Sequence, residues 1–398
     1  MARPESCPVP DPGDAPGHGL RHPCPVSWFL DDLAAKAAER ERAGLTRRLV
    51  ARDGDALLDL AGNDYLGLTT NADVILGATT AARRYGGGAG ASRLVTGTLP
   101  IHDQLEGALA ELLEAGSALV FSTGYHANLG AVTALAGADT LIVSDAHIHA
   151  SLIDAARLSR AQVAVARHND TADVERILSA RSQPRAMIVV ESIYSVLGDA
   201  APLAELDEIA RRHDAILLID EAHGVGVAGD RGQGLTASLG LSRADHVVVT
   251  VTLSKSLAAQ GGAVLGHPAV REQLVNTARS FIYDTGLAPA AAGAALAATA
   301  ALSDDPGLAF RVRANAAILA ESCGVQPPAG AVLSVPMPGP REALAAVAVC
   351  AERGIRIGCF RPPSTPDGIS RLRITAHAQH TSDEIARATK VLSEIAGQ

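Results

Sequence analysis

The sequence predicts an α/β fold, in which a large domain with a mostly parallel central sheet flanked by helices is followed by a smaller α/β C-terminal domain. From about residue 104, helical stretches alternate with short apolar runs that are continuously hydrophobic, as in parallel strands buried on both faces. Beyond about residue 303 the pattern changes to a separate set of strand-like and helix-like stretches. A chain of 398 residues is long enough for both domains.

The expected elements follow one another along the chain. Residues 1–26, rich in proline and glycine, are expected to form a disordered extension. Residues 27–60 are expected to be an N-terminal helical segment, because apolar positions recur at helical spacing. The large domain is assigned to residues 61–302 and the small one to residues 303–398. Strands of the large domain are expected at 118–122, 140–144, 162–166, 186–190, 215–220 and 246–252, and the alanine-rich stretch 286–302 is expected to be a packed helix.

Composition narrows the class of protein. With 43 acidic and 34 basic residues the net charge is -9, which disfavours a nucleic-acid partner. The five cysteines are scattered and lack paired spacing, so neither a zinc site nor a disulfide framework is expected. No apolar run typical of a signal peptide lies near residue 1, and no stretch has the pattern of a membrane span. A cytoplasmic enzyme is the expectation.

Polar residues gather where the expected strands end. In an open α/β sheet the ligand crevice lies beyond the carboxyl ends of the strands. The ends in this sequence carry Ser122-Thr123-Gly124, Ser144-Asp145, Glu191-Ser192, Asp220-Glu221-Ala222-His223 and Thr252-Leu253-Ser254-Lys255.

The lysine at the last of these strand ends is unusual for this chain. Of 34 basic residues only Lys36, Lys255 and Lys390 are lysines. Arginine stays protonated and cannot act as an amine nucleophile, whereas a lysine amine can form a Schiff base. Lys255 is therefore a candidate for covalent catalysis, with a phosphate-binding lysine or chance as the alternatives.

Asp220 ends an apolar run, and a carboxylate there needs a partner. A protonated pyridine nitrogen is one such partner, and pyridoxal phosphate enzymes use this pair to keep the ring electron-accepting. A salt bridge to an arginine is the alternative. Gly124 begins a turn before a helix, which can offer backbone N–H groups to a phosphate, and the hydroxyls of Thr252 and Ser254 are further candidate donors.

The histidines leave several interpretations open. His147 and His149 lack the partners of a metal site, so one of them is expected either to stack on a cofactor ring or to form an ordinary loop hydrogen bond. His102 and His223 have the same ambiguity. The G-x-G-x-x-G match within HGVGVAG is not followed by an apolar helix, and no phosphate-binding G-x-x-x-x-G-K-[ST] motif occurs. A dinucleotide-binding protein or an NTPase is thus not expected.

Seven stretches together resemble the α-oxoamine synthases, which are pyridoxal phosphate enzymes of fold type I. The resemblance covers the chain from about residue 27 to its end, and Leu197, Ala258 and Ala259 depart from the family pattern. The stretches are NDYLGL (63–68), GAGASRLVTGT (88–98), IHASL (148–152), ESIYSVLGDAAPLAEL (191–206), DEAHGVGV (220–227), TLSKS (252–256) and FRPPSTPDGISRLRIT (360–375).

The resemblance implies pyridoxal 5'-phosphate as cofactor, with Lys255 joined to it covalently. It implies that Asp220 pairs with the ring nitrogen and that His149 stacks on the ring. The other implied cofactor contacts are Gly124, Tyr125, Glu191, Ser195, His223, Thr252 and, from the second subunit of a homodimer, Thr285.

For the substrates, the resemblance implies that Arg373 holds the carboxylate of an amino acid with help from Asn63. Arg47 and Arg361 are implied to contact an acyl substrate, with a surface charge pair as the alternative for Arg361. No metal, nucleic acid or membrane is expected to take part.

The implied reaction is the decarboxylative condensation of L-alanine with pimeloyl-CoA, or pimeloyl-carrier protein, in biotin biosynthesis. Within the family the alternatives are glycine C-acetyltransferase and then 5-aminolevulinate synthase, which differ in amino acid and acyl chain. From another class, a catalytically silent protein that only binds the aldehyde cofactor is an alternative. Retention of Lys255, Asp220 and Arg373 together argues against it.

Overall fold

The computed structural model describes residues 27–52 and 57–396, and the expected extension 1–26 lies outside them. The chain divides into two compact units, Met1–Ala51 and Arg52–Gln398. In the first unit, helix α1 (Ser27–Arg42) confirms the helical spacing, and Lys36 pairs with Asp32 on its exposed surface. Strand β1 (Leu58–Leu60) belongs to the second unit. The range 27–60, expected to be helical, therefore ends in a strand.

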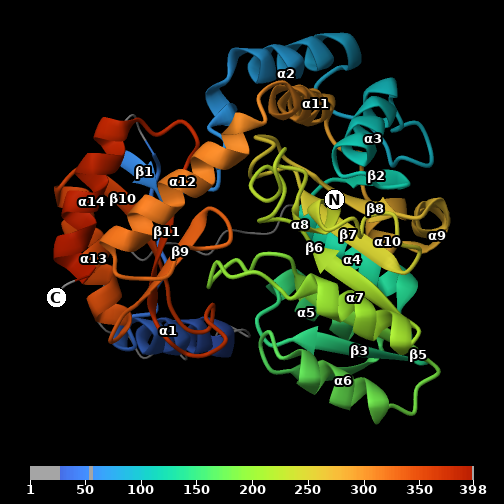
Figure 1. Cartoon of the computed structure of the whole chain (residues 1–398), viewed down its shortest axis with the longest axis horizontal. Coiled ribbons are helices and arrows are strands. Elements are labelled where there is room, and N and C mark those ends of the chain that lie inside the picture. Colours follow the sequence, from blue (N-terminus) through green and yellow to red (C-terminus); the bar gives the residue numbers. More distant parts are fainter. Residues whose placement is uncertain (1–26, 53–56, 397–398) are drawn as a thin grey trace, which may run out of the picture. The chain divides into compact units, whose positions relative to one another are not determined.

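The larger sheet of the second unit has seven strands in the order β2-β8-β7-β6-β5-β3-β4 (Figure 1). The ladders that join β4, β3, β5, β6 and β7 are parallel, as predicted, and every strand expected in the large domain is present. Strand β8 was not expected and runs antiparallel to both β7 and β2. The strands are β2 (Ser117–Phe121), β3 (Thr140–Asp145), β4 (Gln162–Ala166), β5 (Arg185–Glu191), β6 (Ala215–Asp220), β7 (Val247–Thr252) and β8 (Gly262–Gly266).

Helices cover both faces of this sheet, because alternate strand residues point to opposite faces. Residues such as Ile188 and Ile219 pack with α2 (Ala72–Tyr85), α3 (Pro100–Leu112), α6 (Thr171–Ser179), α7 (Leu203–Arg212) and α11 (Pro289–Asp304). Their strand neighbours Met187 and Leu218 pack with α4 (Gly124–Leu135), α5 (Ala150–Ser159), α9 (Pro268–Thr277) and α10 (Arg279–Ile282). The expectation of burial on both faces is wrong for β4, an edge strand that exposes Val163 and Val165.

A second sheet has four strands in the order β1-β10-β11-β9. Strand β11 (Arg371–Thr375) runs antiparallel to β9 (Val332–Pro336) and to β10 (Ile355–Phe360), and β1 adds in parallel to β10. Helix α13 (Pro340–Glu352) packs on β10 and β11, and α12 (Gly307–Ser322) packs on α14 (Ser382–Ala396). The sheet contains the strands expected near the C-terminus, while the domain boundaries remain predictions. None of the helices in the described residues is long and apolar enough to cross a membrane.

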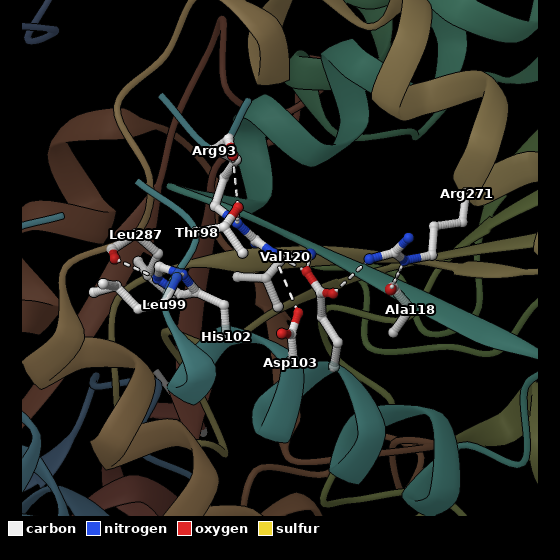
Figure 2. Close-up of polar contacts among 10 residues, drawn as sticks. Arg93, Thr98, Leu99, His102, Asp103, Ala118, Val120, Arg271 and Leu287 are labelled. Carbon is white, nitrogen blue, oxygen red and sulfur yellow. Dashed lines mark hydrogen bonds and ion pairs between the residues drawn. The ribbon is translucent and has the colours of Figure 1, made fainter. Parts of the chain in front are cut away.

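A buried ion cluster anchors α3 to the edge of the larger sheet (Figure 2). One oxygen of Glu106 accepts hydrogen bonds from Arg93 Nη1 at 2.9 Å and from the Val120 N–H at 3.0 Å. Its other oxygen accepts from Arg271 Nη2 on α9 at 3.0 Å. A buried carboxylate needs such partners to remain charged, so the cluster fixes the loop before α3 against β2 and α9.

His102 on the same helix has a structural contact rather than a place in a site (Figure 2). Its Nε2 lies 2.8 Å from the carbonyl oxygen of Leu287, and its Nδ1 accepts from the Leu99 N–H at 3.1 Å. Burial lowers the pKa of His102, which favours the neutral ring. The contact holds the segment between α10 and α11, in which Thr285 is exposed.

The segment 192–201 forms a hairpin between β5 and α7, closed by an antiparallel bridge between Ile193 and Ala200. At its far end Gly198 has a φ of 79°, and a Cβ there would lie 2.0 Å from the Val332 carbonyl oxygen. Only glycine fits this approach. The hairpin therefore extends from the larger sheet to β9 of the smaller one.

His168 connects this hairpin to the end of β3. Its Nδ1 lies 2.8 Å from Asp145 at the end of β3, and its Nε2 lies 2.9 Å from Asp199 in the hairpin. The ring also contacts those of His147 and Tyr194, with centroids 4.3 and 4.5 Å away. Burial alone lowers the pKa of His168, but the hydrogen bonds and charges of the two carboxylates outweigh it and raise the pKa to about 9.

We expect the His168→Gln substitution to remove a contribution to stability that depends on pH. A histidine whose pKa is raised by folding stabilises the folded state fully below its unfolded pKa of 6.5, and this stabilisation is lost as pH rises through about 9. The loss of unfolding free energy caused by H168Q should shrink over that range, by at most about 3 kcal/mol. Urea unfolding of both proteins at about pH 6 and pH 9.5 measures this difference.

The matched control for this prediction is His246→Gln, because His246 pairs with a single carboxylate, Asp207, at 2.8 Å. It shows how the removal of a paired histidine elsewhere in the fold changes the unfolding free energy at each pH. An effect of H168Q that stays constant from about pH 6 to pH 9.5 would contradict a charged His168.

Candidate active site

A cavity of about 290 Å³ lies at the carboxyl ends of β2, β5, β6 and β7. This is the edge of the sheet at which the sequence places polar chemistry. Among its lining residues, the ones that the sequence predicts are Gly124, Tyr125, His149, Glu191, Asp220, His223, Thr252 and Lys255. The lining also contains Ser254, whose hydroxyl the sequence offers as a phosphate donor, and it contains Thr123, Asn128, Ser151, Ala222 and Val251.

Asp220 ends β6 and is buried, at 4% exposure. One carboxylate oxygen accepts from Asn128 Nδ2 at 2.8 Å and the other from the Ala222 N–H at 2.9 Å. Asn128 also donates to Ser151 Oγ at 2.9 Å, and that hydroxyl lies 2.7 Å from His149 Nδ1. A chain of hydrogen bonds thus connects the acid to the histidine predicted to stack on the ring.

Sequence reasoning missed Asn128 and Ser151 in this chain. Asn128 lies four residues after Gly124, so it lies about one turn further along the same side of α4. That spacing is the signal that could have found it. Ser151 lies in the first turn of α5, two residues after its N-cap His149, within the stretch IHASL.

The start of α4 is built to accept an anion. Gly124 is its first residue, and the N-cap Thr123 accepts from the His126 N–H. The first N–H groups of a helix have no partner inside the helix and bind anions well. A Cβ on Gly124 would lie 3.0 Å from that of Thr252, so glycine lets the helix start approach the end of β7. The Thr252 hydroxyl, 2.7 Å from that of Ser254, adds donors at this point.

Lys255 follows β7 and lines the cavity. Among the described residues its Nζ has no hydrogen bond or ion pair, which leaves the amine available to a bound molecule. Burial lowers the pKa of Lys255, and the charge of Asp220 opposes that shift. A lowered pKa increases the fraction of neutral amine, which is the form that attacks a carbonyl or takes a proton.

Arg373 on β11 reaches from the smaller sheet toward the same region. It is buried, and it donates to Asn63 Oδ1 at 3.1 Å, to the Tyr65 hydroxyl at 3.4 Å and to the Ser195 carbonyl oxygen at 3.1 Å. The structure therefore brings together the two residues that the sequence predicts to hold an amino-acid carboxylate, Arg373 and Asn63.

Tyr65 connects this group to the cavity and was missed as a site residue. Its hydroxyl lies 3.0 Å from Asn63 Oδ1 and 2.8 Å from Nδ1 of His223, which lines the cavity. Burial raises the pKa of Tyr65 and, with the charges of Lys255 and Arg373, lowers the pKa of His223 well below its usual value. His223 is accordingly a neutral imidazole near Lys255 and Arg373.

Six predicted site residues do not line the cavity: Asn63 and Arg373, described above, and four others. Ser195 takes part through its backbone, because its N–H donates to Glu191 Oε2 at 2.9 Å. Thr285 is exposed between α10 and α11, and Arg361 follows β10. Arg47 belongs to the first unit. The roles assigned to these residues remain predictions.

The cavity fits pyridoxal phosphate in its donors and charges. The helix start with Gly124 and the Thr252 hydroxyl match a phosphate, Asp220 matches a protonated ring nitrogen, and Lys255 matches an aldehyde. No cluster of three or more His, Cys, Asp or Glu side chains that could hold a metal occurs in residues 27–52 and 57–396.

Known proteins resemble the chain over most of its length. The family model for aminotransferase class I and II matches residues 55–392. The 8-amino-7-oxononanoate synthases of Mycolicibacterium gilvum and Mycolicibacterium smegmatis are 54% and 53% identical over 373 residues, which cover 93% of this chain and 97% of each relative.

Solved structures resemble the chain in the same way. The serine palmitoyltransferase of Sphingomonas wittichii is 28% identical, with a TM-score of 0.85 over 93% of this chain and 97% of its own. The 8-amino-7-oxononanoate synthase of Francisella tularensis is 26% identical, with a TM-score of 0.74 over 85% of this chain and 97% of its own. These matches confirm the fold class, the enzyme class and the resemblance to the α-oxoamine synthases. The chain belongs to the aminotransferase class I and II family of pyridoxal phosphate enzymes.

Proposed function

We propose that the protein catalyses the reaction of the 8-amino-7-oxononanoate synthases in biotin biosynthesis. In that reaction L-alanine condenses with pimeloyl-CoA, or with pimeloyl-carrier protein, and carbon dioxide and the free carrier leave. One observation carries the proposal: the amine of Lys255 and the carboxylate of Asp220 line one cavity in a chain that is 54% identical to a relative of that name.

Bound pyridoxal phosphate supplies an electron-accepting ring that stabilises a carbanion on the amino acid. Asp220 would bind the ring nitrogen, and its hydrogen bonds from Asn128 and the Ala222 N–H keep the carboxylate oriented for this. The start of α4 and the Thr252 hydroxyl would bind the phosphate.

Arg373 and Lys255 would then act on the amino acid. The guanidinium of Arg373, held by Asn63 and Ser195, binds the substrate carboxylate and so decides which Cα bond is presented to the base. Lys255 removes the Cα proton as a general base, because its lowered pKa favours the neutral amine. Arg47 and Arg361 remain candidates for contacts with the acyl substrate.

We also propose that the working form is a homodimer in which Thr285 contacts the phosphate bound by the second subunit. Two observations support it: Thr285 is exposed, and it does not line the cavity of its own chain. The hydrogen bond between His102 and the Leu287 carbonyl holds its segment in place. Cytoplasmic location remains a prediction.

We expect borohydride to trap the cofactor on Lys255. Reduction makes the bond between the lysine and the aldehyde cofactor permanent, and trypsin does not cleave after a modified lysine. Digestion should then yield the peptide of residues 244–271 with the mass of the reduced cofactor added, as read by mass spectrometry. Lys36 and Lys390 are internal controls that should stay unmodified. If the cofactor-loaded protein has the reduced cofactor on another peptide, the covalent role of Lys255 is wrong.

We expect the purified protein to condense L-alanine with a pimeloyl thioester. A panel that pairs alanine, glycine and serine with pimeloyl-, acetyl-, succinyl- and palmitoyl-CoA, and alanine with pimeloyl-carrier protein, should give the largest product signal for alanine with one of the pimeloyl donors. Product mass identifies the pair. Turnover restricted to glycine with acetyl-CoA would instead assign the protein to the glycine C-acetyltransferases.

We expect Arg373→Lys to weaken binding of the amino acid. Lysine keeps the charge but loses the planar set of donors that binds a carboxylate at two points. A loss of about 1.5 to 3 kcal/mol corresponds to a KM for alanine that rises about 10- to 100-fold, with little change in KM for the thioester. Arg371→Lys, two residues away on β11 and paired with Asp367, is the matched control and should leave both KM values unchanged. Equal effects of the two substitutions would contradict the carboxylate role.

A further inference from the structure

Glu191 has a carboxyl oxygen that no contact described above uses. The residue ends β5, lines the cavity and is 2% exposed. Its Oε2 accepts the Ser195 N–H at 2.9 Å, whereas Oε1 has no hydrogen-bond partner among the described residues. An unpartnered buried oxygen destabilises the protein unless something meets it. The cavity is where Oε1 can find that partner.

The neighbour of Glu191 is a second carboxyl group. Glu191 and Asp220 are register partners in the parallel ladder of β5 and β6, so their side chains lie side by side on one face of the sheet. Asp220 accepts two hydrogen bonds, from Asn128 and from the Ala222 N–H. Glu191 accepts one, and no cationic side chain in the described residues lies within ion-pair distance of it. Two adjacent carboxyl groups do not both ionise readily, and Glu191 has fewer hydrogen bonds to stabilise a negative charge than Asp220 has.

The other groups that face Glu191 do not make it easier to ionise than Asp220. They are Lys255 after β7, Tyr65 before α2, and Tyr194 in the hairpin. Burial and the charge of Asp220 raise the pKa of Glu191 to about 8, although the Ser195 N–H and Lys255 oppose the shift.

We propose that Glu191 is an uncharged carboxylic acid in the resting site and that its Oε1 hydroxyl donates a hydrogen bond into the cavity. The acceptor is an oxygen of bound pyridoxal phosphate or of its amino-acid substrate, so the inference rests on the proposed function. The site then contains one carboxylate, Asp220, for the ring nitrogen, and one neutral donor. This differs from a second carboxylate that would compete with Asp220 for the same cations.

Infrared difference spectroscopy of the cofactor-loaded protein tests the protonation state. The spectrum of the wild type minus that of Glu191→Gln should contain the C=O stretch of a neutral carboxylic acid at about pH 6. The band should give way to a carboxylate band as pH rises above about 8, because a hydrogen bond donated to the cofactor or substrate would further favour the protonated form. A carboxylate band present throughout the range would overturn the proposal. Glu221, buried behind Ser192 and Thr236, contributes equally to both spectra and cancels.

Binding measurements test the donor. Glutamine keeps an N–H donor at the same place, so E191Q should bind pyridoxal phosphate and alanine within about threefold of the wild type below pH 8. Alanine at position 191 removes the donor and should weaken one of the two by about tenfold or more. A raised Kd for the cofactor identifies a cofactor oxygen as acceptor, and a raised KM for alanine alone identifies a substrate oxygen. Equal weakening by E191Q and E191A, or no weakening by E191A, would overturn the donor role.

Two further measurements separate an effect specific to Glu191 from a general effect of altering a buried carboxyl group. Glu221→Gln, which alters an equally buried carboxyl group that does not line the cavity, is the control and should leave the Kd for the cofactor unchanged. Above pH 8 the wild type should lose cofactor or substrate affinity while E191Q does not. Absence of pyridoxal phosphate binding by the wild type would count against the proposed function itself. A failure confined to the Glu191 variants counts only against this inference.

Discussion

The site depends on keeping one carboxylate charged at the end of a buried strand. Asp220 lies among apolar residues such as Ile219, where an ion is costly unless it is hydrogen-bonded. Asn128 and the Ala222 N–H supply the donors. Because Asn128 lies on α4 and also bonds Ser151, the same carboxylate fixes the helix that begins at the anion-binding turn and, through that hydroxyl, the ring of His149.

Two basic side chains lie in the region of this acid. Lys255 comes from the larger sheet and Arg373 from the smaller one. His223 lies near both and is hydrogen-bonded to Tyr65, and its lowered pKa keeps it neutral, so it adds no positive charge between them. Each basic side chain is therefore left to a different part of a bound molecule: the neutral amine of Lys255 to a carbonyl carbon and the guanidinium of Arg373 to a carboxylate.

The sequence predicts the fold well where the signal is local, in the apolar residues of one strand and the polar residues at its end. Continuous apolar runs identify β2 to β7, and the rule for strand ends finds Glu191, Asp220 and Lys255. It does not find β8, because GAVLG is short and bounded by glycines. His168 was also missed, since its partners Asp145 and Asp199 are distant in sequence and only the folded chain brings all three together.

The backbone of Ser195 binds one side chain from each sheet. Its N–H binds Glu191 on the larger sheet, and its carbonyl oxygen binds Arg373 on the smaller one. At the far end of the hairpin, Gly198 packs closely against the backbone of Val332. The guanidinium of Arg373 and the carboxyl group of Glu191 are thus both held by the backbone of Ser195. A change at either side chain is therefore expected to be felt by the other through the backbone of one residue.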